Sequence, residues 1–100
     1  MRRIAKVDEN QREIVAAFRR LGWSVALTHQ VGGGFTDIVI GRGGVNILVE
    51  IKDGNKPPSK RRLTPDEEEF HATWRGRIEI VESLDDVMSI NTLLGTERPL

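Results

Sequence analysis

The sequence contains no cysteine, carries no net formal charge and lacks a long hydrophobic run. The absence of cysteine excludes disulfide bonds and metal sites built on thiolates. No stretch approaches the roughly 20 apolar residues of a membrane span. The basic N-terminus is not followed by the apolar segment of a secretion signal. We therefore expect a cytoplasmic protein.

The 100 residues are 38% hydrophobic and 30% charged, which is typical of one soluble globular domain. We expect residues 1–94 to form this domain and residues 95–100 to be a flexible tail. Zero net charge argues against a protein that holds nucleic acid by overall charge. The charges are nevertheless segregated, because residues 52–62 include five Lys or Arg and residues 66–69 are four consecutive acids.

Hydrophobic periodicity predicts a first helix that Asp8 begins and Gly22 ends. A strand is expected over residues 23–30, followed by a glycine-rich loop. Two further strands are expected within residues 35–54. The helix residues predicted to face the core are Val7, Ile14, Val15, Phe18 and Leu21.

A second helix is predicted with Thr64 as its N-cap, Glu67 completing a capping box and Gly76 ending it. A strand over residues 77–82 and a last helix capped by Ser83 follow. The last helix is expected to turn these residues inward: Leu84, Val87, Met88 and Leu94. The resulting order of helix, three strands, helix, strand and helix predicts a mixed α/β or α+β domain with a small central sheet.

Two charged residues stand on the otherwise aliphatic strand NILVEIK. Successive strand side chains point to opposite faces, so Glu50 and Lys52 share a face. If the preceding hairpin closes with Gly43–Gly44, Asp37 lies directly opposite Glu50. If it closes with Arg42–Gly43, Asp37 lies diagonal to Glu50. A three-residue loop would separate them.

Two carboxylates this close repel each other unless a cation lies between them. Asp37 and Glu50 could therefore hold Mg²⁺ or Mn²⁺, and Lys52 could contact the attacking water or a phosphate oxygen. Such a cation is a common means of hydrolysing phosphodiesters. The alternative is that Glu50 and Lys52 form a salt bridge near a strand end and Asp37 is a turn residue.

The pair TD followed 13 residues later by EIK resembles the PD-(D/E)xK nuclease motif. With the segments VGGGFTDIVIG, NKPPSKRR and LTPDEEEFHATWRG, the chain resembles the VRR-NUC family, especially small stand-alone members from phages. The resemblance covers residues 2–90. It implies a restriction-endonuclease-like fold and Mg²⁺- or Mn²⁺-dependent cleavage of branched DNA, like that of Holliday-junction resolvases. It also implies a homodimer, and a phage protein working in the cytoplasm of a bacterial host.

The resemblance also implies roles for individual residues. Asp37 and Glu50 would be metal ligands together with the main-chain carbonyl of Ile51, and Lys52 would be the catalytic lysine. Where the motif has its proline, this chain has Thr36, which shapes the turn rather than the chemistry.

Two further positions depart from the family pattern. Family members often have Gln where this chain has Glu67, which remains a candidate for contact with the site. They also have a first-helix Glu that faces the metal. In this chain that position falls at or next to Asn10, and Glu13 lies three residues on along the same helical face. Glu13 is our catalytic candidate, with Asn10 as its rival.

The basic loop holds candidate DNA contacts at Lys56, Lys60, Arg61 and Arg62, because phosphate contacts generate most DNA affinity. The alternative is a solvated charged loop.

Four other residues receive structural roles. His29 and His71 are expected to be surface or structural residues. Trp23 and Trp74 are expected to pack in the core or at a dimer interface.

Three kinds of function remain open. The first is a metal-dependent DNA endonuclease. The second is an inactive nuclease-fold module that binds DNA, a possibility favoured by the missing first-helix Glu. The third is a virion or interaction protein whose charged segments bind a partner.

Overall fold

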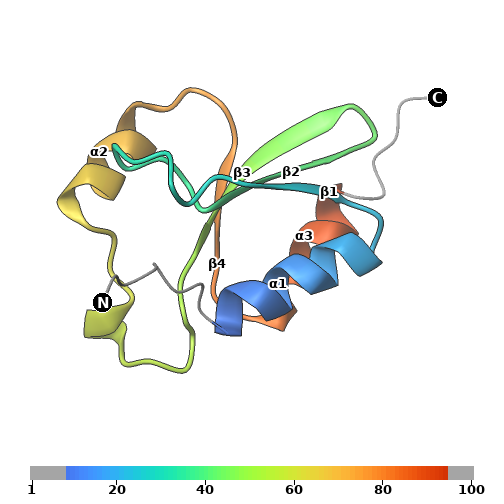
Figure 1. Cartoon of the computed structure of the whole chain (residues 1–100), viewed down its shortest axis with the longest axis horizontal. Helices are drawn as coiled ribbons and strands as arrows, with labels where there is room; N and C mark the ends of the chain where they lie inside the picture. The colour runs from blue at the N-terminus through green and yellow to red at the C-terminus, as the bar shows by residue number, and fades with distance from the viewer. Residues whose placement is uncertain (1–8, 95–100) are drawn as a thin grey trace, which may run out of the picture.

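The computed structural model describes residues 9–94, which form three α-helices, four strands and one short 3-10 helix. The predicted fold class and order of elements are confirmed (Figure 1). The predicted helix start at Asp8, the residue Val7 and the tail 95–100 lie outside the described residues. In chain order the elements are α1 (Glu9–Arg20), β1 (Ser24–Leu27), β2 (Ile38–Arg42), β3 (Val45–Ile51), η1 (Pro58–Lys60), α2 (Pro65–Thr73), β4 (Ile78–Val81) and α3 (Leu84–Leu94).

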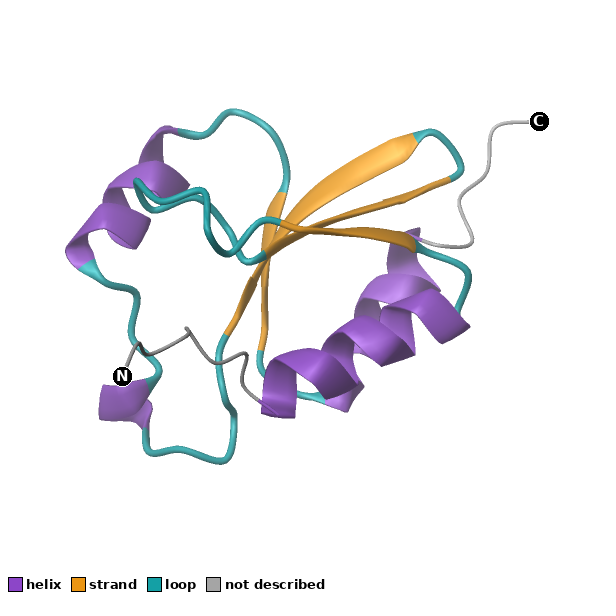
Figure 2. Ribbon diagram, in the orientation of Figure 1, coloured by secondary structure: helices purple, strands orange, loops and turns teal. Residues whose placement is uncertain are grey.

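The four strands form one mixed sheet in the order β1-β2-β3-β4. The first three strands are antiparallel neighbours, whereas β4 runs parallel to β3. A parallel pair needs a crossover connection, and here the crossover contains α2. Helices α1 and α3 lie together along the sheet, and α2 lies apart from them with the long loops (Figures 1 and 2).

The hydrophobic core lies between the sheet and the α1–α3 pair. Ile14, Val15 and Phe18 of α1 are buried, as their spacing predicts, and Leu21 packs partly buried against them. Trp23 is only 3% exposed, and its indole N–H donates to Asn91 Oδ1 at 3.0 Å. The prediction that Trp23 packs in the core is confirmed.

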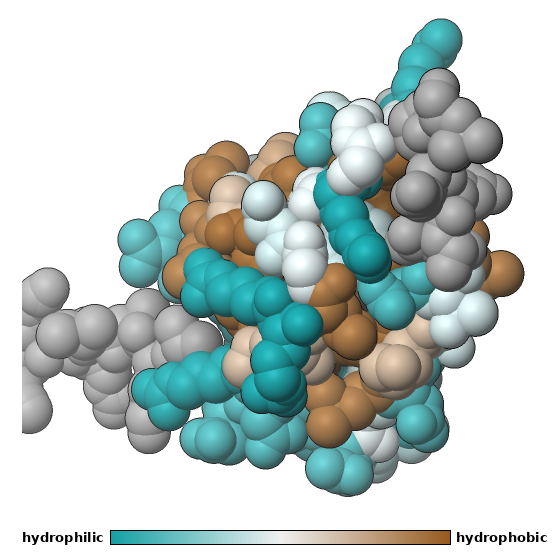
Figure 3. Space-filling view, turned by 90° about the vertical axis from the view of Figure 1, so that its right-hand side faces the viewer, coloured by the Kyte–Doolittle hydropathy of each residue, from teal (hydrophilic) through white to brown (hydrophobic). Residues whose placement is uncertain are grey.

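The buried face of α3 differs from the prediction. Val87 and Ile90 are buried and Leu94 packs partly buried against the core, but Leu84 and Met88 are 49% and 50% exposed. Positions 87, 90 and 94 form one stripe at helical spacing. Leu84 and Met88 lie to one side of that stripe, so the helix turns them outward. The end of the molecule at the right of Figure 1 mixes hydrophobic and hydrophilic side chains (Figure 3).

Strand β1 and helix α2 are both shorter than predicted. Strand β1 stops at Leu27, and Thr28 adds one more pair of contacts in the same register: its N–H donates to the Asp37 carbonyl and its hydroxyl to the Thr36 carbonyl, each at 2.8 Å. Helix α2 ends at Thr73, before the predicted end at Gly76. The predicted capping box of α2 is confirmed in both of its hydrogen bonds.

Helix α2 has no buried residue of its own and is held by a small aromatic cluster. Phe70 stacks on Trp74 with ring centroids 5.2 Å apart, and Phe35 meets the edge of Phe70 at 5.2 Å. Trp74 remains 42% exposed, so it lies at the rim of this cluster rather than in the core. Gly34, with a φ of +83°, brings the glycine-rich loop directly against the Asp66 carbonyl at the start of α2.

We predict that Gly34→Ala destabilises the protein more than Gly32→Ala does. Both glycines have a positive φ, 83° and 86°, so the backbone strain is matched. A Cβ at Gly34 would overlap the Asp66 carbonyl, whereas one at Gly32 would meet nothing within 4 Å. The extra loss in the free energy of unfolding should be about 1–3 kcal/mol, measured by denaturant titration. Equal losses would show that the loop does not pack tightly on α2.

Candidate functional site

The hairpin between β2 and β3 closes with the two-residue turn Gly43–Gly44. Arg42 pairs with Val45, and the ladder continues to the pair Ile38 and Val49. Both turn glycines have positive φ, as a type I′ turn requires. The next positions outward are Asp37 and Glu50, so the first of the two registers considered from the sequence is confirmed.

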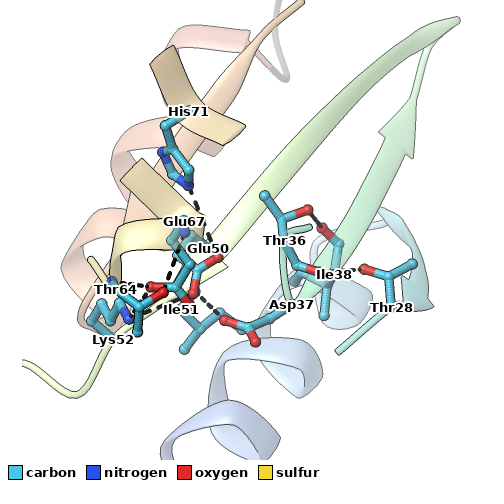
Figure 4. A network of polar contacts seen from close by, with 10 residues as sticks. All are labelled: Thr28, Thr36, Asp37, Ile38, Glu50, Ile51, Lys52, Thr64, Glu67 and His71. Atoms are coloured by element: carbon cyan, nitrogen blue, oxygen red, sulfur yellow. Dashed lines mark hydrogen bonds and ion pairs between the residues drawn. The ribbon is translucent and has the colours of Figure 1, made fainter. Parts of the chain in front are cut away.

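Asp37 immediately precedes β2 and is fixed against the end of β3. Its Oδ2 accepts a hydrogen bond from the Ile51 N–H at 2.8 Å. Its main-chain carbonyl accepts the hydrogen bond from Thr28. The main chain and the carboxylate of Asp37 are therefore each held by one hydrogen bond, and the carboxylate faces the adjacent carboxyl of Glu50 (Figure 4).

Glu50 is a buried carboxyl, only 2% exposed. Its Oε2 lies 3.7 Å from Lys52 Nζ, and its Oε1 is buried without a hydrogen-bond partner. Burial and the neighbouring carboxylates of Asp37 and Glu67 raise the pKa of Glu50 from 4.5 to about 9, although Lys52 opposes the shift. Without a cation, Glu50 therefore keeps its proton at neutral pH.

Lys52 reaches across the site to α2. Its Nζ lies 2.8 Å from Glu67 Oε1, and the side chain is 15% exposed. Burial would lower the pKa of Lys52, but the hydrogen bond to Glu67 and the nearby carboxylates outweigh burial and raise it above the usual value. Burial would likewise raise the pKa of Glu67, but Lys52 and the Thr64 N–H lower it. Both groups are therefore charged at neutral pH.

One carboxylate oxygen of Glu67 accepts hydrogen bonds from two groups. The oxygen that binds Lys52 also accepts the Thr64 N–H at 2.9 Å, which closes the capping box of α2. The start of α2 is thus tied to the lysine at the end of β3. The expectation that Glu67 contacts the site agrees with this geometry.

Of the two first-helix candidates, Asn10 contacts the strand that carries the site. The Asn10 side-chain amide donates to the main-chain carbonyl of Lys52 at 2.9 Å. Glu13 is exposed and lines a shallow groove with Asn10, Gly54 and Glu82. The structure therefore brings Asn10, rather than Glu13, to the end of β3.

His71 was expected to be a surface or structural residue, and the structure places it beside Glu50. Its side chain is only 14% exposed, and its Nε2 lies 3.9 Å from Glu50 Oε1 (Figure 4). Burial lowers the pKa of His71, so the imidazole is neutral at pH 7. The sequence signal was its position four residues after Glu67, which places both side chains on one helix face. His29 is half-buried in the loop after β1.

The basic loop divides into exposed and engaged residues. Lys56, Lys60 and Arg62 are exposed. Arg61 instead donates to the Lys56 carbonyl at 2.7 Å and pairs with Glu82 at 3.3 Å. Arg61 therefore holds the loop against the end of β4, and the other three cations are free to meet a ligand in solution.

The site fits a divalent cation bound by few protein groups. Within residues 9–94, no three Asp, Glu or His side chains converge closely enough to form a metal site by themselves. Asp37 and Glu50 do lie opposite each other, and the buried carboxyl of Glu50 has one oxygen, Oε1, without a hydrogen-bond partner. Mg²⁺ commonly binds one or two carboxylates and keeps several waters. Main-chain carbonyls and water would complete such a site, and ligation by the Ile51 carbonyl stays a prediction.

No protein-family model matches the chain, and no curated protein or solved structure matches it significantly. None of the helices within residues 9–94 has the length and apolar character needed to cross a membrane.

We predict that Glu50→Gln stabilises the cation-free protein at alkaline pH. Below about pH 4.5 Glu50 is protonated in both the folded and the unfolded state. Between about pH 4.5 and 9 the unfolded chain has lost this proton and the folded chain keeps it, so stability falls as pH rises. Gln carries no such proton. Each 1 kcal/mol relieved should raise Tm by roughly 4–8 °C.

Thermal melts in EDTA from pH 4.5 to 9 would test this. The Tm of Glu50→Gln should exceed that of the unaltered protein increasingly with pH, by about 4 °C or more at pH 8. Glu68→Gln, at an exposed position of α2, is the matched control and should follow the unaltered protein. Parallel Tm curves for Glu50→Gln and the unaltered protein would contradict the prediction.

Proposed function

We propose that the protein is a Mg²⁺- or Mn²⁺-dependent DNA endonuclease that hydrolyses phosphodiester bonds. The observation that carries the proposal is the position of Asp37 opposite the buried carboxyl Glu50, one step beyond the last ladder pair of Ile38 with Val49, with Lys52 Nζ 3.7 Å from that carboxyl. Buried charges in proteins are usually paired or bind metals. A cation would supply the positive charge that two adjacent carboxylates require.

Each group would have a distinct part in hydrolysis. Asp37 and Glu50 would hold the cation, whose chemistry is to polarise a phosphate oxygen and to lower the pKa of water. Lys52 would stand beside the negative charge that develops as the water oxygen bonds to phosphorus and the leaving oxygen departs. An ammonium group has three N–H donors, so the bond to Glu67 leaves two for the substrate.

The basic loop supports a nucleic-acid substrate despite the zero net charge. Lys56, Lys60 and Arg62 present exposed cations in the loop that joins Lys52 to Thr64, and they would contact phosphates of a bound nucleic acid. Three further parts of the proposal follow from the resemblance alone. They are a preference for branched DNA, action as a homodimer, and a role as a phage protein in the bacterial cytoplasm.

A second candidate is a DNA-binding module of the same fold without activity. Two observations favour it. The helix position beside β3 is occupied by Asn10 rather than by a carboxylate. Lys52 is also tied to Glu67 by a 2.8 Å contact. Such a module would keep the basic loop and lose the chemistry.

We predict that Asp37→Asn, Glu50→Gln and Lys52→Ala each reduce DNA cleavage by at least about 100-fold. Each removes a cation ligand or the charge beside the reacting phosphate, and single electrostatic groups of this kind contribute roughly 10²–10³-fold to rate. Cleavage would be measured with duplex, single-stranded, flapped and four-way-junction DNA in Mg²⁺, Mn²⁺ or EDTA. Glu68→Gln is the control and should cut like the unaltered protein.

Two results would overturn the endonuclease. Cleavage that all three variants retain would come from another site or from a contaminant. If folded protein cuts no substrate in either metal but still binds DNA, the inactive module is the better description.

We predict that Lys60→Ala and Arg62→Ala each weaken DNA binding and reduce the slope of log K against log salt by about 1. Both side chains are exposed in the basic loop. Binding would be measured by fluorescence anisotropy in EDTA. Arg20→Ala, exposed at the end of α1 far from the loop, is the charge-matched control. An unchanged slope for both loop variants would show that the loop does not contact phosphates.

A further inference from the structure

Two buried polar atoms face each other across the site without partners. His71 Nε2 on α2 and Glu50 Oε1 on β3 are both buried, and neither makes a hydrogen bond in the structure. They lie 3.9 Å apart, and the imidazole points at the carboxyl (Figure 4). Leaving a buried donor or acceptor unsatisfied is costly, and such groups are rare in native proteins. The pair therefore has a state in which both atoms are satisfied.

The 3.9 Å separation limits what that state can be. It exceeds the roughly 2.7–3.2 Å of an N–H···O hydrogen bond. It is also shorter than the roughly 4.5 Å that a water spans when it bonds two groups at a tetrahedral angle. A small rotation of either side chain closes a direct hydrogen bond, whereas a bridging water would force the two groups apart.

The two oxygens of Glu50 have different neighbours. Oε2 lies beside Lys52 Nζ, whereas Oε1 lies beside His71. A carboxylate that holds a cation needs a fixed plane, because a rotated plane directs its lone pairs away from the ion. Lys52 cannot fix that plane alone, since its closest contact is with Glu67.

We propose that His71 is a positioning residue for the cation site, whose Nε2–H donates a hydrogen bond to Glu50 Oε1 when the cation is bound. This role rests on the proposed function. His71 acts through Glu50 and does not itself touch the cation. Groups that orient a metal ligand in this way typically contribute about 10–100-fold to metal affinity. Helix α2 thereby becomes part of the cation site.

Calorimetric titration of the full chain with Mn²⁺ tests the role. His71→Phe keeps an aromatic ring and removes the N–H, and it should weaken Mn²⁺ binding by about 10-fold or more. His71→Gln offers an amide N–H at similar reach and should stay within about 3-fold of the unaltered protein. Melts in EDTA would establish that both variants are folded. A purely structural role would not separate Phe from Gln in this way.

A second measurement uses the unaltered protein and does not depend on how the variants fold. Nitrogen NMR of the Mg²⁺-bound protein should show a protonated Nε2 on His71 whose proton exchanges slowly. An unprotonated Nε2 would overturn the proposal, because that atom could not donate.

The remaining outcomes separate the two proposals. Unaltered Mn²⁺ affinity in His71→Phe, or equal losses in His71→Phe and His71→Gln, would overturn the role of His71 and leave the cation site standing. Nitrogen coupling to Mn²⁺ in a spin-echo spectrum would also overturn it, because His71 would then be a direct ligand. No Mn²⁺ binding by the unaltered protein would overturn the cation site itself, and the role of His71 with it.

Discussion

The buried carboxyl of Glu50 is the constraint around which the rest of the site is built. Its charge is opposed by burial and by two neighbouring carboxylates, of which Asp37 lies directly across the hairpin. A folded chain would ordinarily avoid such a group, because an apolar residue at the same position would pack into β3 without penalty. The surroundings compensate for it only in part, through Lys52 on the next position of the same face. This excess of negative charge lowers the stability of the folded protein. Such a loss of stability is common at sites whose binding or chemistry requires unfavourable charges.

The site also determines how the molecule holds together. Helices α1 and α3 are fixed by the hydrophobic core, but α2 has no buried residue and depends on contacts at its ends and along one face. Those contacts are the approach of Gly34, the aromatic cluster around Phe70, and the ion pair of Glu67 with Lys52. Since one of these contacts belongs to the site, the position of α2 and the charge state of the site are linked.

Local chemistry explains which features the sequence could predict. The Gly43–Gly44 turn and the capping box begun by Thr64 depend on residues close in sequence, so they were predicted correctly. The outward faces of Leu84 and Met88 depend on how α3 lies on the sheet, which helical spacing alone does not determine. His71 was missed for the same reason, since its partner is 21 positions earlier and the crossover through α2 brings them together.

The balance of charge in the site distinguishes the two candidate functions physically. With every carboxylate ionised, Asp37, Glu50 and Glu67 carry three negative charges against the single positive charge of Lys52, since His71 is neutral at pH 7. The excess of two matches one divalent cation. With a neutral Gln in place of Glu67, the excess would be one. Glu67 therefore adds to the negative charge that a cation would balance, while it holds Lys52 in place. In the proposed endonuclease, Lys52 would have to contact a phosphate without leaving Glu67, and its three N–H donors are sufficient in number for both contacts.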